Sequence, residues 1–421
     1  MSGLGWFRGE RSVHTGWRRR SRLLTAAGAG LVLAAGISIA TFAAPGSHAS
    51  SMSAADQTVA KTGAKTGAKT GAKARKMTQL TGPLEVVSVT PSNGARYANG
   101  GLPIKIVFSA PLAANSPMPV LSPHIAGSWR VAGDAAVFTP TAGYLQRTKV
   151  TISIPGGSTG VAADGATQQS TTPGYGYLAS SVKETFTTGW FSTLRLQQLL
   201  AQLGYLPLTW TSGAGGSVSP GNASGQLAAA YQPSQGSFSW QSGYPSMLHS
   251  FWKQGSNNMI DVGAIRAFEN DHGLTMDGYA GSSVWQHLLY AVAKSQNNRN
   301  GYTYALASKA SPETLTIWHN GHVVLHTLAN TGIPVAPTAD GTFPVYLRYY
   351  FQVMKGTNPD GSKYSDPVYY VAYFNGGDAV HYFPRYSFGY PQSLGCVELP
   401  WDSAKKAWPY LTYGSLVTVA G

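Results

Sequence analysis

Short runs of alternating apolar and polar residues follow one another from about residue 84 to residue 188. A period of two places every second side chain on one face, which is the pattern of a half-buried β-strand. Turn-forming clusters such as Pro91-Ser92-Asn93-Gly94 separate the runs, as expected for strands joined by short connections. The predicted strands lie at 86–89, 104–108, 136–138, 150–154 and 184–186. We therefore predict a small β-sandwich over residues 82–188 and no catalytic constellation within it.

The hydrophobic period becomes that of a helix between residues 191 and 290. Two apolar stripes recur at helical spacing, and each stops at a glycine, which commonly ends a helix. The stripes are Leu196, Leu199, Leu200 and Leu203, before Gly204, and Val262, Ile265 and Phe268, before Gly273. A long insert rich in glycine and serine, about residues 212–258, separates them. We predict a small helical domain at 191–290 whose leucines form its core.

The pattern of residues 301–421 again predicts strands joined by turns. Two apolar runs, 315–318 and 323–325, flank Asn320-Gly321, a dipeptide typical of two-residue β-hairpin turns. Three histidines lie close to this turn, namely His319, His322 and His326. They raise the hypothesis of a metal site, but no carboxylate accompanies them. We interpret them as exposed hairpin residues and expect no metal.

Length and composition agree with a multidomain, mainly β chain. The 421 residues allow about three domains, and 43% hydrophobic residues are enough for globular cores. The 50 glycines and only 11% charged residues favour turn-rich β-structure over helical bundles.

The N-terminus has the features of an export signal. A basic cluster that ends at Arg22 precedes an apolar run from Leu23 to Ala44, and small residues follow up to Ala49. A basic, an apolar and a small-residue region in this order are typical of a signal peptide. The apolar run of about 22 residues is also long enough to span a bilayer. We therefore expect residues 1–49 to be a cleaved signal peptide or a retained signal anchor, with the remainder outside the cytoplasm.

The basic charge of the chain is concentrated near its beginning. The formal net charge is +13, yet residues 81–421 hold 18 basic and 15 acidic residues. Residues 50–81 contain three copies of a Lys-Thr-Gly-Ala repeat, a composition that cannot bury a core and indicates a flexible basic linker. No folded domain carries the dense basic face that binds phosphates, so we exclude a nucleic-acid partner.

Cys396 is the only cysteine of the chain. Exported proteins usually pair their cysteines as disulfides, so an unpaired thiol indicates either nucleophilic chemistry or a buried apolar role. A thiol attacks carbonyls as the thiolate and therefore needs a base nearby. His381 ends the predicted strand 378–383, and the residues from Pro384 to Gln392 read as a loop. A strand, a loop and a return would bring His381 and Cys396 together.

The C-terminal region resembles the catalytic domain of bacterial L,D-transpeptidases, the cysteine enzymes that cross-link peptidoglycan. That family carries a histidine, a loop, and then a Ser/Thr-His-Gly-Cys signature. The matching elements here are His381 and Ser393-Leu394-Gly395-Cys396. Upstream, Asn330-Thr331-Gly332 and the stretch 337–345 are similar to the family's "N-T-G … T-P-x-G-x-F/Y" pattern. Two positions depart from it: Leu394 replaces the second histidine, and Glu398 replaces the usual Asn or Arg.

The resemblance implies a role for each residue of the motif. Cys396 would be the nucleophile and His381 its base, with the backbone carbonyl of Tyr382 orienting the imidazole. The N–H groups of Gly395 and Cys396 would hold an oxyanion. Ser393 would either bind substrate or stabilise the loop. The implied reaction passes through a thioester and needs no cofactor, and the departures bear on substrate preference more than on catalysis.

Two accessory regions also resemble wall-protein modules. Residues 82–188 are similar to bacterial Ig-like spacer domains, and residues 191–290 are similar to a helical peptidoglycan-binding repeat. Within the second region, Asp277-Gly278 and Trp285 match that repeat's "D-G-x-x-G-x-x-T/V-W" stretch. The resemblance therefore implies a wall-associated enzyme at the cell envelope that acts on peptidoglycan stem peptides, and we expect a monomer.

Two alternatives stay open from the sequence. The first is a thiol peptidase or L,D-carboxypeptidase, which would pass the acyl group to water instead of an amine. The second is a catalytically inactive wall-binding protein, in which Leu394 and Glu398 mark a decayed site.

Overall fold

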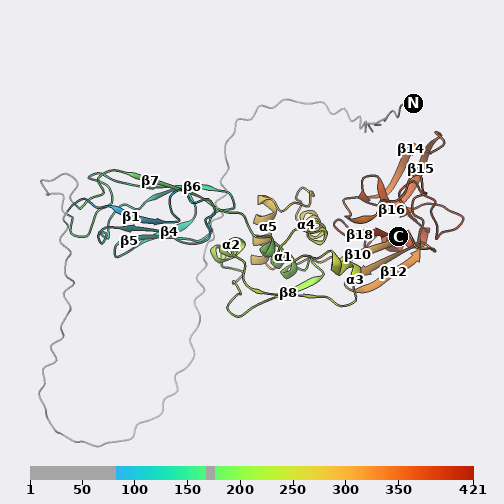
Figure 1. Cartoon of the computed structure of the whole chain (residues 1–421), viewed down its shortest axis with the longest axis horizontal. Coiled ribbons are helices and arrows are strands. Elements are labelled where there is room, and N and C mark those ends of the chain that lie inside the picture. The colour runs from blue at the N-terminus through green and yellow to red at the C-terminus, as the bar shows by residue number, and fades with distance from the viewer. Residues whose placement is uncertain (1–81, 167–175) are drawn as a thin grey trace, which may run out of the picture. The chain divides into compact units, whose positions relative to one another are not determined.

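The computed structural model describes residues 82–166 and 176–421. This part of the chain is mainly β, with eighteen strands and six helices (Figure 1). The predicted signal and linker, residues 1–81, lie outside the described residues. Within the described ranges, no helix combines the length and the apolar character needed to cross a membrane.

The first region, residues 82–188, consists of two antiparallel sheets that share one hydrophobic core. The strand orders are β1-β2-β5-β4 and β3-β6-β7. Alternate residues of β2, such as Ile106, and of β6, such as Ile152, point into the same core, which is the reason for the period of two in the sequence. All five predicted strands are confirmed. The short strand β3 and the longer strand β4, which have few buried residues, were not predicted. The strands are β1 Val86–Thr90, β2 Ile104–Phe108, β3 Val120–Ser122, β4 Gly127–Ala132, β5 Ala135–Pro140, β6 Lys149–Ile154 and β7 Val182–Thr187.

The second region contains five helices and one two-stranded antiparallel sheet. Both predicted apolar stripes are confirmed as helices, since they lie on α1 and α4 and face one core. The Gly/Ser-rich insert between the two stripes contains α2, β9 and α3, which were not predicted. The elements are α1 Thr193–Gln202, β8 Leu208–Ser212, α2 Ala223–Tyr231, β9 Gly236–Trp240, α3 Ser246–Ser250, α4 Met259–Asp271 and α5 Ser282–Ala293. The helical core also includes Tyr304 and Leu416 of the C-terminal region.

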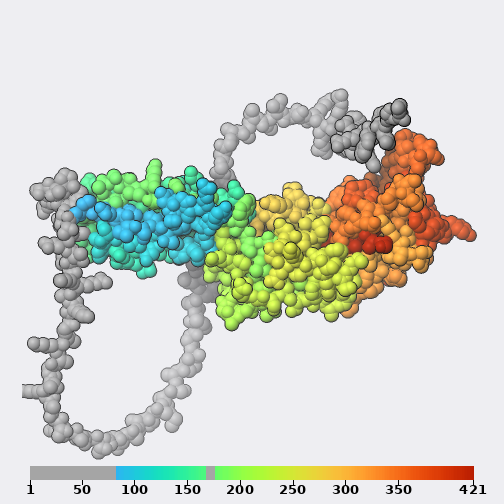
Figure 2. All heavy atoms as spheres, viewed as in Figure 1, coloured from blue at the N-terminus to red at the C-terminus, as the bar shows by residue number. Residues whose placement is uncertain are grey.

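The C-terminal region is built from two sheets and a short helix. The first sheet has the order β12-β11-β10-β18-β13, and the second has the order β14-β15-β16-β17. Side chains of both sheets, such as Ile317 and Val380, close around a shared core. The outer surface of this region is orange and red in Figure 2. The elements are β10 Thr303–Ser308, β11 Thr314–His319, β12 His322–Leu328, β13 Gly341–Pro344, β14 Leu347–Thr357, β15 Lys363–Asn375, β16 Asp378–Tyr382, β17 Val397–Leu399, α6 Trp401–Ala407 and β18 Leu416–Ala420.

The predicted two-residue hairpin between β11 and β12 is confirmed. Asn320 and Gly321 have φ values of 49° and 79°, and both residues of a type I′ turn need positive φ. β14 and β15 form a longer hairpin that extends beyond the other strands of its sheet (Figure 1). β16 and β17 occupy the other side of that sheet and pair in parallel, so the segment between them must cross from one end of the sheet to the other.

Candidate active site

The parallel pairing of β16 and β17 sets the relation between His381 and Cys396. His381 lies directly beside Glu398 in the register, and Cys396 precedes Glu398 by two residues. Neighbours in register point to the same face of a sheet, and so do residues two apart along a strand. His381 and Glu398 therefore belong to one face, and Cys396, which directly precedes β17, continues the same alternation. The expected strand, loop and return are all present.

The imidazole of His381 is held in one tautomer. Its side chain is 3% exposed, and Nδ1 lies 2.9 Å from the backbone carbonyl oxygen of Tyr382. A carbonyl only accepts hydrogen bonds, so Nδ1 carries the proton and Nε2 keeps its lone pair. Burial lowers the pKa of His381, because the charged form loses its hydration. The ring is thus a neutral base with Nε2 as the accepting atom.

The thiol of Cys396 is neutral at ordinary pH. Its Sγ is half-buried and donates to the carbonyl of Gly377 at 3.8 Å. Burial, followed by the charges of Asp378 and Glu398, raises the pKa of Cys396 to about 12. The sequence led us to expect a thiolate made by His381, whereas burial favours a thiol beside an uncharged imidazole. Among the described residues, no hydrogen bond joins Sγ to the ring.

The high pKa predicts an unusual pH dependence of alkylation. Below its pKa, a thiol's thiolate fraction rises about tenfold per pH unit. The rate constant for labelling Cys396 with iodoacetamide should therefore keep rising past about pH 10, where an ordinary thiol with a pKa of about 8.5 has levelled off. The urea-unfolded chain is the matched control, since its thiol is hydrated. A folded protein that levels off together with the unfolded chain would contradict the assignment.

Ser393 fixes the turn before Cys396. Its side chain is buried, and its Oγ donates to the carbonyl of Cys396 at 2.6 Å and accepts from the N–H of Gly395 at 3.2 Å. These contacts favour the loop-stabilising role over substrate binding. They also mean that the N–H of Gly395, an expected oxyanion donor, already has an acceptor. Gly395 has a φ of +118°, and a Cβ there would lie 2.5 Å from Asp378 Oδ1, so this position requires glycine.

An ion pair between Arg385 and Glu398 was missed by the sequence reasoning. The guanidinium donates from Nε to Oε2 and from Nη2 to Oε1, each at 2.8 Å. Nη2 also donates to the carbonyl of Gln392 at 3.1 Å. This bidentate pair connects the loop to β17 beside His381. Glu398 drew attention as a departure from the family pattern, but its partner lies thirteen residues away in a loop, and no sequence pattern identifies it.

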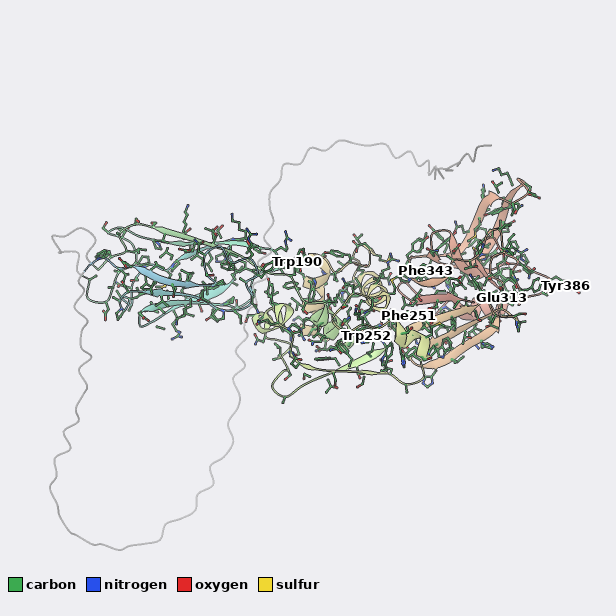
Figure 3. All side chains as sticks on the ribbon, in the orientation of Figure 1. Trp190, Phe251, Trp252, Glu313, Phe343 and Tyr386 are labelled. Carbon is green, nitrogen blue, oxygen red and sulfur yellow. The ribbon has the colours of Figure 1, made fainter. Side chains whose placement is uncertain are left out.

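The Asn330-Thr331-Gly332 motif forms hydrogen bonds to the loop that precedes Cys396. Asn330 Oδ1 accepts from the N–H of Gly389 at 2.9 Å. Thr331 donates from its N–H and its Oγ1 to the buried carboxylate of Glu313, at 2.6 and 2.7 Å. Its carbonyl accepts from the N–H of Ser393 at 3.0 Å. Farther along the loop, Tyr386 is fully exposed and points away from the domain, whereas Glu313 lies inside it (Figure 3).

Two of the three hairpin histidines hydrogen-bond to neighbouring strands. Nδ1 of His319 lies 3.0 Å from Thr303 Oγ1, and Nδ1 of His326 lies 2.8 Å from Thr316 Oγ1. In the ranges that the structure describes, no three His, Cys, Asp or Glu side chains gather as ligands of a metal ion.

The comparisons with known proteins agree with the family resemblance predicted for the C-terminal region. Residues 302–419 match the YkuD family, described as the L,D-transpeptidase catalytic domain. The chain therefore carries such a domain, as predicted for residues 301–421, and the match does not extend to residues 82–290. No curated protein matches the chain.

Several solved structures are similar to the chain. An L,D-transpeptidase from Mycobacterium smegmatis is 16% identical, with 80% of this chain and 100% of that chain covered and a TM-score of 0.27. L,D-transpeptidase 3 from Mycobacterium tuberculosis is 14% identical, with 79% and 98% covered and a TM-score of 0.26. The catalytic domain of the E. faecium L,D-transpeptidase is 27% identical, with 28% and 95% covered and a TM-score of 0.26.

Proposed function

We propose that this protein is an L,D-transpeptidase that cross-links peptidoglycan stem peptides through a thioester on Cys396. The observation that carries the proposal is the placement of Cys396 and His381 on one sheet face within the stretch that matches the catalytic-domain family. A free Nε2 on a buried neutral imidazole suits a general base, and a lone thiol suits a nucleophile.

The first half-reaction transfers the acyl group to the enzyme. Sγ of Cys396 attacks the carbonyl of the third residue of a stem tetrapeptide, while its proton passes to His381 Nε2. The carbonyl of Tyr382 holds the imidazolium through Nδ1–H, and the backbone N–H of Cys396 is the candidate donor to the oxyanion. The C–N bond to the terminal D-alanine then breaks, and its nitrogen takes the proton from His381. A thioester and free D-alanine result.

The second half-reaction releases the enzyme. An amine of a neighbouring stem attacks the thioester carbonyl and gives up a proton to His381 Nε2. The C–S bond breaks, and the sulfur takes that proton from His381. Substrates, Cys396 and His381 supply every atom and proton, so the steps balance without a cofactor. Water in place of the amine would give L,D-carboxypeptidase activity, which is the alternative outcome.

Product analysis tests this function. We expect the protein, incubated with a stem tetrapeptide, to give a cross-linked dimer and one D-alanine per link, both measurable by liquid chromatography and mass spectrometry. Tripeptide as the sole product would make the protein a carboxypeptidase. The absence of both products, from protein that remains folded, would favour the non-catalytic wall-binding protein.

We propose supporting roles for the rest of the chain. Residues 1–49 would export the protein or anchor it, and the linker 50–81 would give it reach. Residues 82–188 would act as an Ig-like spacer, and residues 191–290 would hold the enzyme on peptidoglycan. The two-sheet core and the helical core support the folded modules, and the substrate of the catalytic domain supports an extracytoplasmic location.

A further inference from the structure

Asp378 neighbours two residues that flank Cys396, one through the chain and one in space. It begins β16 and directly follows Gly377, whose carbonyl accepts the Cys396 thiol. Its Oδ1 also lies 2.5 Å from the position that a Cβ on Gly395 would take. The carboxylate therefore packs on the residue that precedes the nucleophile, where only glycine leaves room for it.

This carboxylate has few partners of its own. Oδ2 accepts two long hydrogen bonds, from the N–H of Ala339 at 3.5 Å and from Asn375 Nδ2 at 3.4 Å. Oδ1 has no hydrogen-bond partner among the described residues. Lys309, a nearby cation, is paired with Asp340 at 2.7 Å. Asp378 thus keeps one oxygen free beside the reacting thiol.

The position of Asp378 is unfavourable for the first half-reaction. Its charge contributes to the raised pKa of the Cys396 thiol, because a carboxylate opposes a second negative charge nearby. Burial in turn raises the pKa of Asp378, so the carboxyl group accepts a proton more readily than an exposed aspartate. A group that hinders thiolate formation and takes up protons is better suited to the second half-reaction, in which a cationic amine must arrive and lose protons.

We propose that Asp378 binds the ammonium group of the acceptor stem and takes one of its protons, so that the acyl-enzyme reacts with the amine in preference to water. The proposal rests on the proposed transpeptidase function. A primary amine is an ammonium ion at neutral pH and is not nucleophilic in that form. Proton transfer to Asp378 frees its lone pair, and the nitrogen attacks the thioester carbonyl. The second proton leaves through His381 Nε2 to the departing sulfur, and Asp378 returns its proton to solvent.

The test separates the two half-reactions with two peptides. The donor is a stem tetrapeptide whose side-chain amine is acetylated, and the acceptor is the tripeptide with a free amine, which has no terminal D-alanine to lose. In Asp378→Asn, the ratio of cross-linked to hydrolysed product should fall about tenfold or more, the effect of losing one charge-assisted hydrogen bond. Acylation by the donor should persist or accelerate, because the thiol loses a neighbouring negative charge. Hydroxylamine, an uncharged acceptor at neutral pH, should still capture the acyl group.

Matched variants make each outcome decisive. Asp378→Ser should show the same fall in the product ratio. Asp340→Asn, which removes a nearby exposed carboxylate paired with Lys309, should leave the ratio unchanged. An unchanged ratio in Asp378→Asn, or an equal loss of acylation, tripeptide transfer and hydroxylamine capture, would overturn the inference. A wild-type protein that the donor never acylates would instead overturn the proposed function and, with it, this role of Asp378.

Discussion

Cys396→Ala is expected to abolish acylation by carbapenems and to lower tetrapeptide turnover by at least about a thousandfold. The resemblance to L,D-transpeptidases implies that these drugs acylate the nucleophile, and Cys396 holds the only thiol of the chain. The substitution leaves the turn intact, because Ser393 Oγ donates to the backbone carbonyl of residue 396 and not to its side chain. Rate and adduct formation are measured by product analysis and by intact-protein mass spectrometry.

Stability provides the control for this substitution. Removing one half-buried sulfur atom should change the free energy of unfolding by no more than about 1 kcal/mol, as measured by chemical denaturation. Cys396→Ser keeps the size of the side chain and should be equally inactive, since a hydroxyl is far less acidic than a thiol. Turnover that survives in a folded Cys396→Ala protein would end the catalytic interpretation of the site.

His381→Gln is expected to lower the rate of acylation by about a hundredfold to ten-thousandfold at neutral pH, the range that general-base catalysis contributes. In this structure the thiol and the imidazole are both uncharged at rest, because burial raises the pKa of the first and lowers that of the second. In the proposed mechanism the histidine therefore acts when substrate arrives, as acceptor of the thiol proton. A glutamine can still donate to the Tyr382 carbonyl, but its amide is not a base.

The pH profile distinguishes a lost base from a distorted site. Since hydroxide can remove the thiol proton unaided, the deficit of His381→Gln in carbapenem acylation should shrink steadily as the pH rises toward the Cys396 pKa of about 12. Stopped-flow measurement of acylation gives the profile for both proteins. Parallel profiles, with a constant deficit at every pH, would indicate a structural defect. Equal rates at neutral pH would place the base elsewhere.

The sequence was sufficient wherever a local pattern determines the structure. The leucines of α1 recur at helical spacing within a few residues. The Asn320-Gly321 turn needs positive φ at two adjacent residues, and these two residue types adopt it readily. The motif around Cys396 likewise led directly to the C-terminal domain that the family comparison matches. In these cases the physical cause lies within the segment itself, so reading the segment is enough.

Features that depend on distant contacts could not be predicted. The thiol is uncharged because of its burial and of two carboxylates, one of which, Asp378, comes from another strand. Arg385 forms its ion pair with Glu398 only because the loop folds back over β17. Elements within the Gly/Ser-rich insert were also missed, since small residues carry little apolar periodicity. The helix α2 is nevertheless capped by Asn222, which accepts from Gly225 N–H, and it contributes Leu227 to the helical core.

The most direct test of the account is to trap the acyl-enzyme formed from a stem peptide. The wild-type protein is mixed with the acetylated tetrapeptide donor, quenched in acid within one turnover, and measured intact by mass spectrometry before proteolysis. We expect one added tripeptide acyl group per chain, located on the fragment that contains Cys396 and removed by hydroxylamine, as a thioester requires. An acyl group on any other residue, or D-alanine release without any covalent adduct at Cys396, would contradict it.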